Sequence, residues 1–240
     1  MPAMPSRGLA DLHLHTCFSD GWPTPTDLVE YARESTRLNV IAITDHDTIE
    51  GALRAADLAA GLKDSPDVIV GEEISSRDGH IVGLFLDRRV RPGMSAAATV
   101  HAIHDQGGFA MAAHPFWRTA RQVNGRGRVH GVGWLAAELD FDAIEVENST
   151  PGFYLFNQMA HRLTEATRVA EVGNSDAHIL DAVGRAYTSF SGRTAADLKD
   201  SIVSRRTRAH RRRYRALGLV RYAAWGLNHQ RAEAVAAAAR

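Results

Sequence analysis

Short apolar runs alternate along the chain with stretches whose apolar residues recur at helical spacing. The apolar runs predict strands over residues 9–14, 40–43, 68–74, 81–86, 109–113, 143–146, 169–172 and 186–190. The stretches at helical spacing predict helices over residues 26–35, 48–62, 95–106, 134–139, 155–167 and 194–204. Strand–helix alternation of this kind is typical of a parallel sheet, and about seven repeats predict closure into one α/β barrel.

Composition is consistent with one globular domain followed by a basic tail. The chain has 240 residues, is 45% hydrophobic and carries a formal net charge of +0, so as a whole it is not adapted to nucleic acid or to an anionic membrane. Eight arginines lie between residues 205 and 221. We therefore expect a barrel over residues 1–204 and a basic, helical C-terminal tail over residues 205–240. A solvated helix and a contact to nucleic acid or anionic lipid both remain open for this tail.

The single cysteine, Cys17, cannot form an internal disulfide, which favours a reducing compartment. Residues 1–7 contain no apolar run of the kind found in signal peptides, and no stretch approaches the ~20 apolar residues that span a bilayer. The expected location is the cytoplasm, with no membrane span.

Potential metal ligands occur where the predicted strands stop. They are His13, His15, Asp45, His46, Glu72, Glu73, His80, His114, Glu145, Glu147, Asn148, Asp176 and His178. In α/β barrels the active site lies at the C-terminal ends of the strands, so these side chains are expected to share one site. His13 and His15 are two residues apart on a strand and should face the same side, with Leu12 and Leu14 facing the other.

This ligand chemistry predicts divalent transition metals. Imidazole combined with carboxylate suits Zn, Mn or Fe better than Mg, and a set this large exceeds the needs of one ion, so two or three ions are expected. Metals about 3.5–4 Å apart can share a bridging hydroxide and hold both oxygens of an in-line displacement, which suits hydrolysis of a phosphate ester.

The motifs resemble those of the PHP (polymerase and histidinol phosphatase) family of metal-dependent phosphoesterases. The resemblance covers about residues 8–203 and rests on Asp-Leu-His-Leu-His-Thr at 11–16, Ser-Asp-Gly at 19–21, Thr-Asp-His-Asp at 44–47, Gly-Glu-Glu-Ile-Ser at 71–75, Ala-His-Pro at 113–115 and Asn-Ser-Asp-Ala-His at 174–178. It implies a distorted (β/α)7 TIM-like barrel with two or three metal ions.

Carried over by position, the resemblance implies three ion sites. The first would be formed by His13, His15, Glu73 and Asp176. The second would share Glu73 and add His80 and His114. The third would be formed by Asp20, His46 and His178. Glu73 is preferred to Glu72 because it occupies the family's Glu-Ile/Leu-Ser position.

The expected function is hydrolysis of a phosphate ester of a small metabolite or nucleotide by a metal-bridging hydroxide. Asp45, Glu73 and Asp176 are the catalytic candidates. Asp45 would orient a ligand imidazole or, equally well, cap the helix over 48–62. Arg118, Asn148 and Arg185 are candidates for holding the phosphate. Glu145 and Glu147 are either site residues or charges at the barrel rim.

Two other functions are compatible with parts of the sequence. Metal-dependent amidohydrolases also begin with His-x-His on a barrel strand, but many bridge their metals with a carbamylated lysine, and neither Lys63 nor Lys199 lies at a predicted strand end. A nucleic-acid-processing exonuclease or phosphodiesterase could use the Arg-rich tail to hold its substrate. No Ser or Cys accompanies a His in a nucleophile motif, which disfavours covalent hydrolysis.

Overall fold

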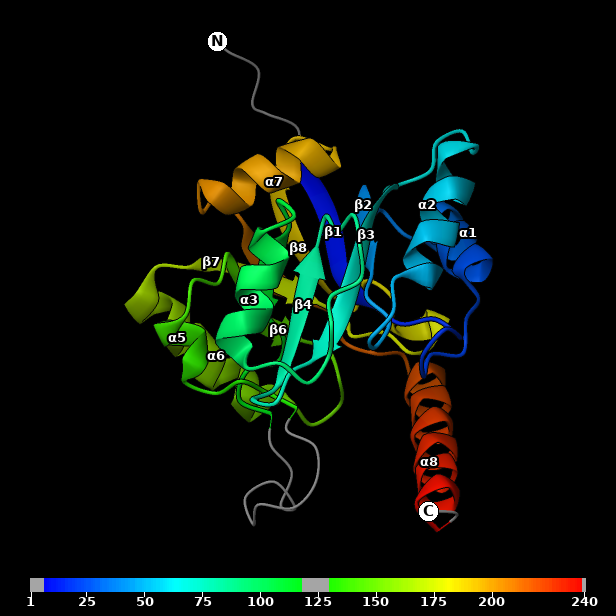
Figure 1. Cartoon of the computed structure of the whole chain (residues 1–240). Helices are drawn as coiled ribbons and strands as arrows, with labels where there is room; N and C mark the ends of the chain where they lie inside the picture. Colours follow the sequence, from blue (N-terminus) through cyan, green and yellow to red (C-terminus); the bar gives the residue numbers. More distant parts are fainter. Residues whose placement is uncertain (1–6, 118–129, 239–240) are drawn as a thin grey trace.

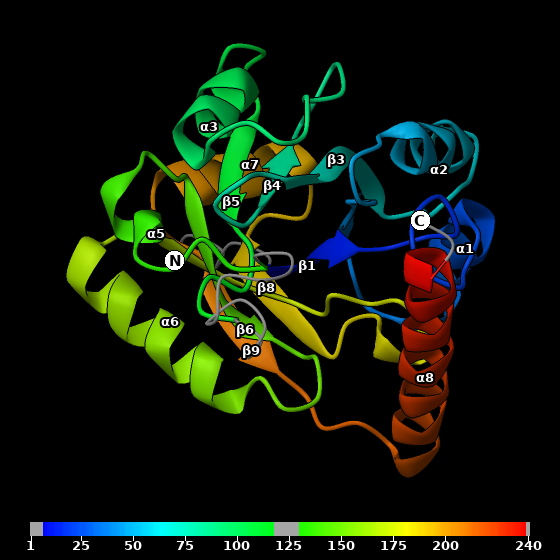
Figure 2. The ribbon, with the colours of Figure 1, turned by 60° about the horizontal axis from the view of Figure 1, so that its bottom comes forward.

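The computed structural model describes residues 7–117 and 130–238, and within this part the strands form one nearly closed, barrel-shaped sheet (Figures 1 and 2). The sheet order is β7-β6-β5-β4-β3-β2-β1-β8-β9. The strands are β1 (Arg7–Leu14), β2 (Val40–Ile43), β3 (Asp67–Ser75), β4 (His80–Leu84), β5 (Phe109–Ala112), β6 (Ala143–Asn148), β7 (Ala170–Asn174), β8 (Ala186–Ser191) and β9 (Arg208–Arg211). A parallel bridge from Leu14 to Ala177, just after β7, joins the two halves of the sheet.

Two strands run against the others. Pairing is parallel within β1-β2-β3 and within β5-β6-β7, as expected for strand–helix alternation. By contrast, β4 is antiparallel to β3 and β5, and β8 is antiparallel to β1 and β9. The predicted parallel pairing is therefore wrong at these strands. The reversal has a functional consequence, because the first residue of β4, His80, pairs with Ser75 at the end of β3 and so lies at the rim where the parallel strands end.

Helices cover the outside of the sheet and one of its ends (Figure 1). They are α1 (Pro25–Ser35), α2 (Glu50–Ala60), α3 (Ala96–His104), α5 (Leu135–Glu138), α6 (Tyr154–Thr167), α7 (Ala195–Val203) and α8 (Ala216–Ala238), with a 3-10 turn, η1 (Leu180–Ala182). Local sequence fixes the start of α1, where Thr24 and Asp27 form a reciprocal capping box next to a proline in the first turn. Thr194 and Asp197 do the same for α7.

The barrel interior is apolar below the site. Inward residues such as Leu12, Val40, Met111 and Val172 pack with Leu198 of α7, which closes the end opposite the site. Leu14, however, packs outward against α1 and α2. The register of β1 shifts between Asp11 and Leu14, so Leu12 and Leu14 do not share a side as predicted. This irregularity allows Leu12 to fill the core while His13 enters the site.

The C-terminal segment contains both strand and helix. Residues Arg208–Arg211 form β9, an edge strand paired with β8, where only helix was predicted. Ala209 is its only apolar residue and each face carries an arginine, so the strand has no hydrophobic alternation to reveal it. The predicted helical tail is present as α8. In the described residues, no helix is both long and apolar enough to cross a membrane.

Candidate metal centre

All nine side chains predicted as metal ligands meet at the rim where the parallel strands end. Seven of them are buried, and Asp20 and His46 are partly exposed. Each comes from a strand end or from the loop that follows, so the barrel itself brings together residues that are up to 165 positions apart, from 13 to 178 in the sequence. Nine imidazole and carboxylate groups in one rim form a site far richer in metal ligands than one ion requires.

Glu73 lies at the centre of this group. Its Oε2 is 3.1 Å from His13 Nε2, 3.3 Å from His15 Nε2 and 3.3 Å from His46 Nδ1. Its Oε1 is 2.8 Å from His80 Nδ1 and 3.1 Å from His114 Nε2. The neighbouring Glu72 points elsewhere and accepts a hydrogen bond from the Val90 backbone, so Glu73 is the glutamate that faces the imidazoles.

A second carboxylate, Asp176, closes the other side of the site. Its Oδ1 lies 3.2 Å from His15 Nε2 and 3.6 Å from His13 Nε2. The backbone of Asp176 adopts φ of 54°, a left-handed conformation that places its side chain beside β1. His13 and His15 therefore lie between two buried carboxylates.

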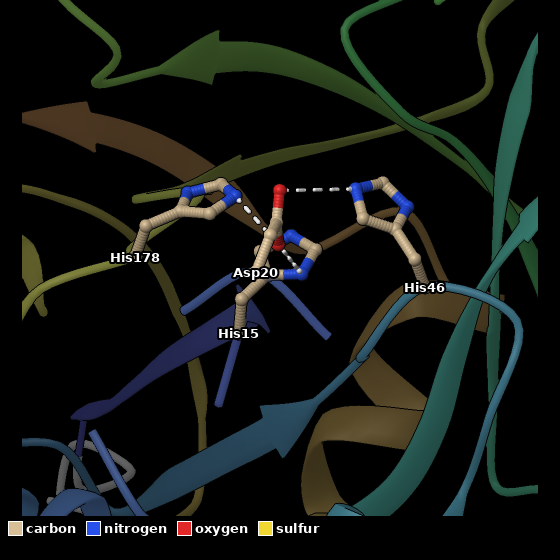
Figure 3. A group of neighbouring side chains, drawn as sticks. All are labelled: His15, Asp20, His46 and His178. Atoms are coloured by element: carbon tan, nitrogen blue, oxygen red, sulfur yellow. Dashed lines mark ion pairs between the residues drawn. The ribbon is translucent and has the colours of Figure 1, made fainter. Parts of the chain in front are cut away.

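The outermost group is formed by His15, Asp20, His46 and His178 (Figure 3). Asp20 stands between the imidazoles, with Oδ1 3.2 Å from His178 Nε2 and 3.6 Å from His15 Nδ1, and Oδ2 3.8 Å from His46 Nε2. Three further groups that could hold an ion combine His13 with Glu73 and His114, His13 with His15 and Asp176, and His46 with Glu73 and His80. In each group the ligand atoms lie within 4.8 Å of one another.

The donor geometry fits divalent cations better than hydrogen bonds. His15 Nε2, His46 Nδ1 and His80 Nδ1 are buried and make no hydrogen bond within the described structure, although each is within 3.3 Å of a carboxylate oxygen. A ring nitrogen and a carboxylate oxygen that lie close together without the alignment of a hydrogen bond are expected when both point at a common ion. Two ligands each ~2.1 Å from a tetrahedral ion would be ~3.4 Å apart, which matches the observed spacing.

The electrostatics of the site also suit a cation. Burial alone raises the pKa of Glu73 and Asp176, but the surrounding imidazoles bring both well below the usual range of a carboxyl group. Burial lowers the pKa of His15, yet Asp176 and Glu73 raise it overall to about 10, whereas the pKa of His46 falls to about 3 through burial. The ionised carboxylates thus attract positive charge, which a metal ion can supply in place of imidazole protons.

The sequence left two roles open for Glu145, a charge at the barrel rim or a residue of the site. The structure places it in contact with two candidate ligands, His13 and His114. It is buried, and its Oε1 is 3.0 Å from His13 Nδ1 while its Oε2 accepts a hydrogen bond from the His114 backbone at 2.8 Å. Contacts of this type fix the ring orientation of a metal-binding histidine. Glu147, two residues on, instead bonds Asn157 and His161 of α6, outside the cluster.

Asn148 does not have the predicted phosphate-facing position. It is fully buried in β6, and its amide group donates to Glu145 Oε2 at 3.0 Å and to Asp176 Oδ2 at 3.1 Å. Both amide hydrogens are therefore used inside the protein. The strand extends two residues beyond the predicted end at Val146, which takes Asn148 into the barrel wall.

Asp45 has neither of the two contacts considered for it. Its Oδ1 accepts hydrogen bonds from the Thr16 backbone at 2.7 Å and from Ser19 Oγ at 2.6 Å, and its Oδ2 accepts one from Thr16 Oγ1 at 2.6 Å. The N-cap of α2 is Ile49, without a side-chain cap. Asp45 therefore holds the turn that carries Asp20, and it neither bonds an imidazole nor caps the helix.

Of the two arginines proposed to hold phosphate, only Arg185 lies in the described part of the chain, and its hydrogen bonds are made elsewhere. The guanidinium of Arg185 donates to the backbone carbonyls of Asp181 at 2.9 Å and Arg213 at 3.3 Å. It lines a separate hollow, so the predicted phosphate contact at the metal site is a misassignment. Arg118 lies outside the described residues.

Aromatic side chains flank the cluster on both sides, which the sequence analysis missed. On one side Trp225 of α8 lies against His178, with ring centroids 4.2 Å apart, and its Nε1 donates to the Asp20 carbonyl at 2.8 Å. On the other, Trp117 meets His114 edge-on at 5.3 Å and lies 4.9 Å from Phe153. The helix α8, which leaves the site rim in Figure 1, is thus part of the site's wall.

Comparison with known proteins finds a family model and relatives that are similar to parts of this chain. A family model described as PHP-associated matches residues 155–207. An uncharacterized protein of Methanocaldococcus jannaschii is 32% identical over 151 residues, which are 58% of this chain and 81% of that protein. A 5'-3' exoribonuclease of Haemophilus influenzae is 43% identical over 90 residues, 36% of this chain, and the match spans only 31% of the exoribonuclease.

The fold has a counterpart among solved structures. A two-domain protein from Bacteroides vulgatus, which contains a predicted PHP-like metal-dependent phosphoesterase, superimposes with a TM-score of 0.68 at 21% identity, over 87% of this chain and 66% of that one. The barrel with its reversed strands, the sequence relatives and the PHP-associated match agree with the motif resemblance. The chain belongs to the PHP family.

Proposed function

We propose that this chain hydrolyses a phosphate ester with two or three divalent metal ions bound at the rim cluster. The observation that carries the proposal is the convergence of nine imidazole and carboxylate side chains, several of whose buried nitrogens approach carboxylates without hydrogen bonding. Their mixture of nitrogen and oxygen donors favours Zn, Mn or Fe. The substrate class we propose is a small phosphorylated metabolite or nucleotide.

The ligands of each ion can be proposed from the four groups of neighbouring imidazoles and carboxylates described above. Glu73 belongs to two of them, and each of its oxygens faces imidazoles, which suits a carboxylate shared between two ions. Asp176 would serve the ion beside His13 and His15, and Asp20 the outermost ion. When bound, such ions generate a nucleophile from water at neutral pH and neutralise the charge that grows on a phosphoryl group.

The protein's own residues would keep the ligands in the required protonation states and orientations. A His13 ring that binds an ion through Nε2 must carry its proton on Nδ1, and Glu145 Oε1 is placed to accept that proton's hydrogen bond at 3.0 Å. The single cysteine, Cys17, is exposed and is not needed as a nucleophile.

An amidohydrolase function is less well supported because no lysine is near the ligands. Lys199 is on α7, where its Nζ donates to the Gly107 carbonyl and lies over the rings of Phe85 and Phe109, at the opposite end of the barrel. Lys63 follows α2. A carbamylated lysine bridge would therefore have no source, whereas Glu73 already occupies the central position.

A nuclease is the second candidate, and the aromatic walls favour it. Stacking of bases on aromatic rings is a common means of holding single-stranded nucleic acid, and Trp117 and Phe153 lie beside the ligand His114. The similarity to an exoribonuclease over 90 residues points in the same direction.

Three substrates compared under the same conditions test these functions. Purified protein supplemented with Mn, Zn or Fe would be assayed on p-nitrophenyl phosphate, on bis-p-nitrophenyl phosphate and on a short 5'-phosphorylated RNA. We expect chelator-sensitive hydrolysis of at least one of them, and the preferred ester separates phosphatase from phosphodiesterase or nuclease. Absence of hydrolysis of all three with every metal would contradict the phosphoesterase proposal.

A further inference from the structure

A hollow of about 400 Å³ lies outside the metal centre. Its wall is formed by the end of α1, by the segment that leads from η1 into β8, and by residues between β9 and α8. None of its lining residues is among the nine candidate metal ligands. Its volume falls within the range of ~300–1,000 Å³ that is common for sites that bind small molecules.

The hollow is strongly cationic. No aspartate or glutamate lines it, whereas four arginines do, namely Arg37, Arg185, Arg212 and Arg215. Arginine stays protonated in proteins, so each contributes a full positive charge. In the part of the chain that the structure describes, ion pairs of arginine involve Arg33, Arg89, Arg208 and Arg221, and none of the four in the hollow. Four uncompensated guanidinium groups around one hollow favour a multiply charged anion.

Two of these guanidinium groups are held in place by the protein. Arg185 is anchored through hydrogen bonds to two backbone carbonyls, those of Asp181 and Arg213. Arg212 lies over the ring of Tyr187 at 4.6 Å, and its backbone N–H donates to the Arg185 carbonyl at 2.6 Å. Groups that are ordered before a ligand arrives lose less conformational entropy on binding. This order distinguishes the hollow from a run of mobile surface charges.

We propose that this hollow binds a small, multiply charged phosphate compound, at a site separate from the metal centre. Planar guanidinium groups match phosphate oxygens in pairs, and the hollow offers several at once. Hydrogen bonds through Asp11 also connect the wall of the hollow to the segment that carries the candidate ligand Asp176. Gly184, which lines the hollow, donates to Asp11 Oδ2, while Asp11 Oδ1 accepts from Ser175, the residue before Asp176.

Calorimetric titration of the metal-loaded full chain with methylenediphosphonate tests the proposal. This probe carries two phosphonate groups and cannot be hydrolysed at its P–C–P bridge. Because the probe also binds divalent ions, the informative comparison is with the double variant Arg37→Gln, Arg215→Gln. Both side chains are exposed and make no hydrogen bond or ion pair to a described residue, so folding and metal content should not change. The exposed Arg88→Gln, outside the hollow, is the matched control.

We expect the wild type and the Arg88 variant to show a saturable binding component that the double variant weakens at least tenfold. Each single variant should weaken it at least threefold, which keeps the test valid if the double variant is unstable. Identical isotherms for wild type and double variant, at equal metal content, would overturn the proposal. The metal-centre component, which all variants retain, reports on the proposed function independently.

Discussion

The substitution Glu145→Gln should weaken metal binding although Glu145 is not itself a predicted ligand. All four hydrogen-bond partners of Glu145 are donors. Oε1 faces His13 Nδ1 and Asn174 Nδ2, both at 3.0 Å, and Oε2 faces the His114 backbone N–H at 2.8 Å and Asn148 Nδ2 at 3.0 Å. A glutamine amide replaces one oxygen with an NH2 group, so in either orientation two of the four donors would face another donor.

The size of the effect follows from this count. A buried donor left without an acceptor costs ~1–3 kcal/mol. Two such donors therefore predict a loss of about 2–6 kcal/mol in the free energy of unfolding if the surrounding side chains do not rearrange. Loss of the partner that orients a metal-binding histidine typically lowers metal affinity 10–100-fold. We therefore expect Glu145→Gln to remain folded at low temperature but to bind at least one ion about tenfold or more weakly.

The assay is competition for Zn between the protein and a chromophoric chelator, combined with urea denaturation. Glu147→Gln is the matched control, since it lies two residues away on the same strand but bonds Asn157 and His161 of α6. Metal affinity in Glu147→Gln should stay within twofold of the wild type. If Glu145→Gln also bound metal within twofold of the wild type, Glu145 would not orient His13 as we infer.

Two further predictions concern stability. In Gly51→Ala the new Cβ would collide with Asp45 Oδ2 and lie 2.8 Å from Thr16 Oγ1, so we expect a loss of ~1–3 kcal/mol by denaturation. Gly226→Ala on α8 meets nothing within 4 Å and should be neutral or stabilising by up to ~1 kcal/mol; equal effects of both substitutions would refute this reading. The hydrogen bond to Glu147 raises the pKa of His161, so the pair stabilises the fold below the ordinary pKa of ~6.5 and this contribution is lost as pH rises through the raised value. Because the ring is 32% exposed the contribution should be below ~1 kcal/mol, and NMR titration should show the pKa of His161 falling in Glu147→Gln.

The sequence was sufficient to predict the barrel and the membership of the cluster. A strand that ends in the core leaves its last polar residues at the rim, so His13, His46 and His114 could be assigned to one site from their positions after apolar runs. Glu73 was separated from Glu72 by the motif, and the structure shows only the former among the imidazoles. The position of a strand end can be read from the apolar run that precedes it, so these ligands could be assigned from nearby residues alone.

Features that depend on contacts between distant segments were not predictable. The reversed directions of β4 and β8 depend on sheet pairing, which apolar runs do not encode. The strand β9 is stabilised by pairing with β8 and lacks a hydrophobic face of its own. Trp225 reaches Asp20 only because α8 packs against the rim, 205 residues away in sequence. Glu145 and Glu147 are two residues apart and would face the same side of a regular strand. The register of β6 shifts between them, and this irregularity, which depends on the pairing with β7, separates Glu145 in the site from Glu147 outside it.

Elemental analysis of protein purified without chelator tests the central claim most directly. We expect two or more divalent transition-metal ions per chain, and the loss of at least one in His13→Ala, because His13 belongs to two of the four ligand groups. Circular dichroism of the variant would establish that it remains folded. One ion or none per folded wild-type chain, or an unchanged metal content in His13→Ala, would contradict the assignment of the rim cluster as a multinuclear metal centre.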